Sequence, residues 1–88
     1  MARFIVIHKG PDEVSQDVVV DAAKALRKSL PAYVKWLNSW FVPTKNQLIC
    51  EWESKDQQTM RSALKSVMAL WPIEVVHEVV HVDPDWYK

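Results

Sequence analysis

The order of strand-like and helix-like segments constrains the fold of this chain more than any other feature. Two segments carry apolar residues at helical spacing: one runs from Ser15 to Leu30, and the other follows Ser54 and ends before Pro72. Four runs rich in β-branched and aromatic residues flank them, at residues 3–9, 33–42, 47–53 and 73–82. The sequence therefore predicts the order strand, helix, strand, strand, helix, strand.

Turn and capping residues separate these segments. Gly10-Pro11-Asp12 is a turn signal after the first strand, and Ser15 is placed to cap the first helix. Ser54 with Gln57 is typical of a capping box at the start of the second helix. The segment "PTKN" (43–46) is short enough to join the second and third strands as a hairpin.

This βαββαβ order predicts a ferredoxin-like α+β sandwich. We expect a four-stranded antiparallel sheet with both helices on one face, because right-handed crossovers send them to the same side. The 88 residues then form a single domain, 1–88, whose other sheet face has no cover within the chain. A chain this short buries only about 60% of its unfolded surface, so a partner subunit would add to its stability.

The hairpin register predicts which side chains lie on the uncovered face. A four-residue loop places Ser39 opposite Cys50 and Leu37 opposite Trp52, on the side that faces the helices. The alternate positions, Ile49 among them, then form the uncovered face. Its candidate ligand-binding or interface residues are Trp36, Asn38, Trp40, Glu51 and Glu53. An exposed aromatic patch of this kind marks an interface or a ligand site.

Two hypotheses account for such a patch. In the first, a second copy of the sheet covers it, which gives a homodimer with the architecture of a dimeric α/β barrel. In the second, the indoles and carboxylates line a pocket, since a ligand site needs only a few polar groups in an apolar lining. The hypotheses are compatible, because a sheet-to-sheet dimer encloses a cavity between its faces.

Composition argues against several classes of function. Eleven basic and eleven acidic residues cancel, so no overall field draws the chain to nucleic acid or an anionic membrane. A single glycine leaves no phosphate-cradling loop, and one cysteine allows no internal disulfide. Without a long apolar segment, we expect a soluble, cytoplasmic protein. We expect Cys50, between Ser39 and Trp52 on the helix-facing side, to be a small buried side chain. A nucleophilic role is disfavoured, because Glu51 and Glu53 would raise the pKa of its thiol.

The histidines offer a candidate metal site. His8 is near the end of the first strand and His77 is in the fourth, and we expect these strands to be neighbours with both rings on one face. Two imidazoles and a carboxylate could hold nickel, zinc or copper. Their spacing is not a recognised ligand signature, so ordinary surface or hydrogen-bonded histidines are the alternative.

The stretches "VKWLNSWFV" (34–42), "CEWES" (50–54) and "EVVHEVVHVDP" (74–84) resemble a bacterial family of small, uncharacterised ferredoxin-like proteins. Its members form dimeric α/β barrels, and some bind nickel. The resemblance implies metal-binding histidines that His8 and His77 match, and a third on the second strand, where this chain has Asn38. A carboxamide is a poorer ligand than imidazole, so nickel binding is expected to be weak.

The sequence supports three hypotheses of function. The first is a homodimer with no enzymatic activity and no required cofactor, which binds a small ligand or a divalent ion in or beside the barrel. The second is a small monooxygenase-like barrel enzyme acting on an apolar or aromatic compound, with Trp36, Trp40 and a histidine in its site. Fold analogy alone supports this enzyme. The third is a purely structural or stress-related module.

Overall fold

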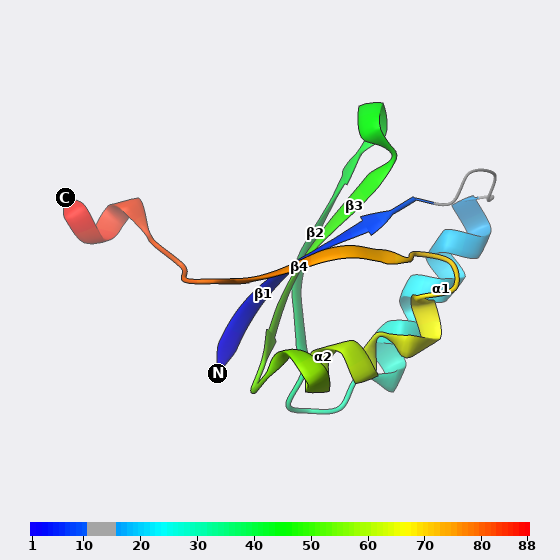
Figure 1. Cartoon of the computed structure of the whole chain (residues 1–88), viewed down its shortest axis with the longest axis horizontal. Helices are drawn as coiled ribbons and strands as arrows, with labels where there is room; N and C mark the ends of the chain where they lie inside the picture. The colour runs from blue at the N-terminus through cyan, green and yellow to red at the C-terminus, as the bar shows by residue number, and fades with distance from the viewer. Residues whose placement is uncertain (11–15) are drawn as a thin grey trace.

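A computed structural model describes residues 1–10 and 16–88 and shows a sheet with helices packed against it (Figure 1). The strands are β1 (Ala2–Lys9), β2 (Lys35–Val42), β3 (Gln47–Ser54) and β4 (Ile73–Val79). The helices are α1 (Gln16–Ser29) and α2 (Gln57–Ala63), and short 3-10 segments are η1 (Pro43–Lys45), η2 (Lys65–Val67) and η3 (Pro84–Tyr87). The strands form one antiparallel sheet in the order β2-β3-β1-β4. The predicted βαββαβ fold is therefore confirmed, while the turn residues Pro11-Asp12 and the cap Ser15 lie outside the described residues.

One face of the sheet, which we call the inner face, carries the buried side chains of the central strands. Alternate residues of a strand point to opposite faces, and burial follows that alternation along β1 and β3. The inner face and the helices together form the core: Phe4, Val6, Leu26, Cys50, Trp52, Met60, Leu64 and Val67. Both helices thus lie on the same side of the sheet, as predicted.

The hairpin between β2 and β3 forms as predicted. Its loop is η1 followed by Asn46, whose φ of 49° is left-handed. Asn46 also accepts a hydrogen bond from the backbone N of Gly10 through its own carbonyl at 2.7 Å, which ties the loop to the end of β1. The register places Ser39 opposite Cys50, which confirms that part of the predicted pairing.

A β-bulge in β2 changes the position of one predicted site residue. The register shifts between Trp36 and Asn38, so that Trp36 lies opposite Trp52 and Leu37 is left out of the pairing. An extra residue in one strand reverses the alternation of its side chains. The rings of Trp36 and Trp52 stack with their centroids 5.6 Å apart and their planes 15° apart. The prediction that Trp36 lies on the uncovered face is therefore wrong, because the bulge turns it toward the core.

The second helix begins later and ends earlier than predicted. Its cap is Asp56, whose carboxylate Oδ1 accepts a hydrogen bond from the Thr59 backbone N at 2.7 Å. The predicted cap Ser54 is instead the last residue of β3, where its side chain is buried. The chain tightens from α2 into η2, but the predicted apolar stripe still faces the core, at Met60, Leu64 and Val67.

The C-terminal segment leaves the sheet. β4 ends at Val79, although the sequence predicted a strand to residue 82, and the chain then projects away from the body and ends in η3 (Figure 1). This tail exposes large apolar side chains, at Val80, Val82, Trp86 and Tyr87. No helix in residues 1–10 and 16–88 has the length and apolar character needed to cross a membrane.

Candidate functional site

The sheet face away from the helices, which we call the open face, includes three rows of side chains that run across the strands. One row is apolar and consists of Trp40, Ile49, Ile7 and Val75. The next row combines polar and apolar residues, in the order Asn38, Glu51, Ile5 and His77. The third row is mainly charged and consists of Lys35, Glu53, Arg3 and Val79.

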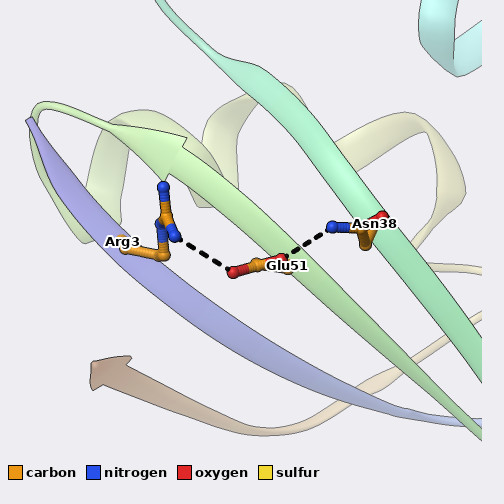
Figure 2. A network of polar contacts seen from close by, with 3 residues as sticks. All are labelled: Arg3, Asn38 and Glu51. Carbon is orange, nitrogen blue, oxygen red and sulfur yellow. Dashed lines mark hydrogen bonds and ion pairs between the residues drawn. The ribbon is translucent and has the colours of Figure 1, made fainter. Parts of the chain in front are cut away.

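A polar network crosses β1, β3 and β2 on the open face (Figure 2). Asn38 Nδ2 donates a hydrogen bond to Glu51 Oε1 at 2.9 Å, and Arg3 Nη1 lies 3.5 Å from Glu51 Oε2. The Glu51 side chain is only 16% exposed, so its charge is partly shielded from water and is offset by Arg3. The predicted placement of Asn38, Glu51 and Glu53 on the uncovered face is confirmed by the register.

Trp40 also lies on the open face, as predicted. It pairs with Ile49 at the end of the sheet nearer the hairpin loop, and 51% of its surface is exposed. Its expected companion, Trp36, lies on the inner face because of the bulge. The hypothetical enzyme site required the two indoles and a histidine to share one surface. Because Trp36 and Trp40 lie on opposite faces, they do not.

The two histidines of the predicted metal site lie on opposite faces. His77 pairs with Ile5 and is exposed on the open face, whereas His8 pairs with Ile73 and is 2% exposed on the inner face. The prediction that they share a face is wrong. The pairing of His77 with Ile5 aligns it with the odd-numbered residues of β1, whose side chains point away from those of the even-numbered ones. The described part of the chain gathers no group of three or more His, Cys, Asp or Glu side chains that could hold a metal ion.

His8 anchors β1 to the segment that follows η2. Its Nδ1 donates a hydrogen bond to the backbone oxygen of Trp71 at 2.8 Å. Because a carbonyl oxygen can only accept, the ring proton is on Nδ1 and the lone pair is on Nε2. Burial lowers the pKa of His8 below 6.5, although the bond to Trp71 partly opposes this effect. The ring is therefore neutral at pH 7.

A cavity of about 190 Å³ lies between α1 and the inner face. Sequence reasoning missed it, although α1 gives a signal: its core-facing stripe includes the small residues Ala22 and Ala23, which leave space above the sheet. The inner face supplies His8, Cys50 and Trp52 to the lining. The lining is otherwise almost wholly apolar.

Cys50 is part of a short hydrogen-bonded chain beside this cavity. Trp36 Nε1 donates to Ser39 Oγ at 2.7 Å, and Ser39 Oγ donates to Cys50 Sγ at 3.0 Å. Cys50 is 3% exposed, which confirms the prediction of a small buried side chain. Burial raises the pKa of the thiol, and the Ser39 hydrogen bond only partly offsets that effect, so Cys50 is a neutral thiol at pH 7.

The fold and its two unlike faces define a small ferredoxin-like protein with a helix-covered and an uncovered sheet surface. The chain matches the family described as nickel responsive protein SCO4226-like over residues 4–79, and it belongs to that family. The resemblance seen in the sequence is thereby confirmed. The crystal structure of SCO4226 from Streptomyces coelicolor A3(2) is similar, with a TM-score of 0.68 and 19% sequence identity. The similarity covers 93% of this chain and 100% of that one, and at this identity it shows the shared fold. No curated protein matched the chain.

Proposed function

We propose that the chain acts as a homodimer, paired through the open face, that binds a small ligand or a divalent ion without enzymatic chemistry of its own. The observation that carries this proposal is the apolar row of the open face. Trp40, half exposed, continues into Ile49, Ile7 and Val75 on a surface that the helices do not cover. Contiguous apolar surface of this kind is typical of an interface.

The charges of the open face favour a second copy as the occupant. Arg3 and Lys35 lie beside Glu51 and Glu53, so both signs are present on neighbouring positions. In a two-fold dimer the same patch meets itself, and a patch with both signs can place each charge near an opposite one. A partner of uniform charge would meet like charges at half of these positions.

The C-terminal tail supports the same occupant. Val80 is 89% exposed and Tyr87 is 75% exposed, and the segment between them projects beyond the body of its own chain (Figure 1). Burying such side chains contributes favourably to association at about 25 cal/mol per Å² of apolar surface. A second copy seated on the open face would offer the tail a surface to cover.

The family description names a nickel response. The donor groups of this chain limit how tightly it can bind nickel. Among the paired residues of the described strands, His77 is the imidazole on the open face, and Glu51 lies in the same row with Ile5 between them. Both oxygens of Glu51 already have partners, Asn38 and Arg3. The residues of one copy therefore do not fit a nickel site, since nickel favours several imidazole or comparable donors. We propose that nickel binding is weak, and that any further donors come from the second copy.

Native mass spectrometry of untagged protein tests this proposal in one measurement. We expect the mass of a dimer carrying little nickel. A subsequent titration followed by tryptophan fluorescence, first with nickel and then with aromatic compounds, shows which class of ligand the dimer accepts. A monomer at micromolar concentration would contradict pairing through the open face, and stoichiometric retained nickel would contradict the weak metal site.

A further inference from the structure

The cavity between α1 and the inner face is separate from the open face, because the sheet lies between them. It exists because Ala22 and Ala23 present only methyl groups toward the sheet, while the floor is formed by Trp52 and Leu48. Phe41 also lines the cavity and is 51% exposed, so the cavity reaches the surface beside β2. A small molecule therefore has a route of entry that does not require the sheet to open.

The size of the cavity fits one aromatic ring. Its volume of about 190 Å³ is somewhat larger than the engineered protein cavity of about 150 Å³, lined by apolar side chains, that stays dry and binds benzene. The rings of Trp36 and Trp52 lie against it as a stacked pair. Flat aromatic ligands pack well against such surfaces.

The lining offers a ligand a strong hydrogen-bond acceptor, the Nε2 atom of His8. His8 Nδ1 is occupied by Trp71, and Nε2 has no hydrogen-bond partner among the described residues. Nε1 of Trp52 has no accessible surface, so it offers the cavity no hydrogen bond. The Ser39 hydroxyl is taken by Cys50 and Trp36. His8 Nε2 is therefore available as an acceptor, and it calls for a donor on the ligand.

Among the described residues, the lining also has no charged side chain, because His8 and Cys50 are both neutral at pH 7. Burying a carboxylate or an ammonium group in such a lining would leave its charge without a partner, which is strongly unfavourable. Charged ligands are therefore excluded by the same residues that favour an aromatic ring.

We propose that this cavity binds a small neutral aromatic molecule carrying one hydrogen-bond donor, for which phenol is the simplest representative. The ring packs between α1 and the stacked tryptophans, and its hydroxyl donates to His8 Nε2. This site is independent of the dimer proposed above, since it lies on the other side of the sheet and is complete within one copy.

Phenol and toluene distinguish this site from an ordinary apolar void, because they have nearly the same shape and differ in the donor. We expect the protein to bind phenol about threefold more tightly than toluene in a calorimetric titration at pH 7, because the hydrogen bond outweighs the extra methyl carbon that toluene buries. A cavity without an available acceptor gives the opposite order, because burying an unpaired hydroxyl is costly. Tighter binding of toluene, or no binding of either compound, would overturn the proposal.

Matched variants on α1 locate the binding. Ala23→Leu fills the cavity and should abolish phenol binding, whereas Ala25→Leu makes the same change at an exposed position that does not line it. Equal loss in both variants would show that the signal arises elsewhere. His8→Phe should remove the preference for phenol over toluene. If His8→Phe does not fold, two measurements still test the proposal. One is the comparison of phenol with toluene on the unmodified protein, and the other is the comparison of Ala23→Leu with Ala25→Leu.

Discussion

The two faces of the sheet place the same kinds of residue in opposite environments. Trp52 on the inner face has no exposed surface and stacks on Trp36, whereas Trp40 on the open face is 51% exposed. His8 is buried and bonded to a backbone carbonyl, whereas His77 is exposed. The role of a tryptophan or histidine in this chain is thus set by the side of the sheet on which it lies, and not by its type.

The faces also differ in how they hold ionisable groups. The inner face keeps His8 and Cys50 neutral through burial. The open face keeps its charges and pairs them, as in the network of Arg3, Glu51 and Asn38 (Figure 2). An inner site therefore suits a neutral ligand, and the open face suits a partner or an ion. The following predictions test this difference.

The largest expected effect is the loss of the buried tryptophan. Trp52→Ala should lower the free energy of unfolding by about 3–5 kcal/mol, the cost of truncating a fully buried aromatic side chain. Tyr33→Ala is a suitable control, because Tyr33 is 55% exposed and an exposed position usually costs about 0.5 kcal/mol or less. Chemical denaturation followed by circular dichroism measures both. Similar losses in the two variants would contradict the inner-face assignment.

A charge on the open face should break the dimer without unfolding the chain. Trp40→Glu places a carboxylate in the proposed interface, where an unpaired buried charge costs several kcal/mol. Light scattering at micromolar concentration should then report a monomer. Val20→Glu adds the same charge on α1, where Val20 is 40% exposed, and should leave the dimer intact. A Trp40→Glu variant that stays fully dimeric would exclude this face as the interface.

The buried thiol should contribute modestly to stability. Cys50→Ala should cost about 1 kcal/mol, the scale of a small core truncation, because Cys50 is 3% exposed. A thiol reagent at neutral pH should react slowly with the native protein, since burial both covers the sulfur and raises its pKa. Rapid modification would show that the thiol is accessible and would contradict the position of Cys50 in the core.

Lowering the pH should reduce the free energy of unfolding, because His8 is buried in its neutral form on the inner face. Its pKa in the folded protein lies below the unfolded value of 6.5, so the unfolded chain takes up the proton first as pH falls. The contribution of neutral His8 to the free energy of unfolding is therefore complete above pH 6.5. It is lost progressively as the pH falls from 6.5 to the pKa of His8 in the folded protein. Denaturation at pH 7.5 and 5.5 should show this loss, and His8→Gln should reduce it. An unchanged pH dependence in His8→Gln would contradict the burial of a neutral imidazole.

Asn38→His should have the smallest effect on stability. It directly tests whether the open face can bind a metal ion. Imidazole binds nickel better than a carboxamide does, so the variant should bind nickel more tightly in calorimetry. The gain should fall as pH drops through about 6.5, because a ligating imidazole must be neutral. Gln58→His, at an exposed position of α2, adds a histidine on the helix side and should give no gain. An Asn38→His variant that binds nickel no better would show that β2 does not face a metal site.

The sequence by itself determined the order of elements, the hairpin and much of the open face. Helical and strand periodicities are local, so they can be read from neighbouring residues. The four-residue loop fixed the register of β2 and β3 near the turn, which placed Trp40, Glu51 and Cys50 correctly. These features depend on residues close together in the chain.

Only the tertiary structure decided the position of Trp36, the separation of the histidines and the existence of the cavity. The bulge that turns Trp36 inward is stabilised by stacking on Trp52, a contact across two strands. The face of His77 relative to His8 depends on the register of β1 with β4, which are joined by most of the chain. The cavity depends on how far α1 lies above the sheet. Each of these is set by packing between distant segments, whose free energy no local pattern records.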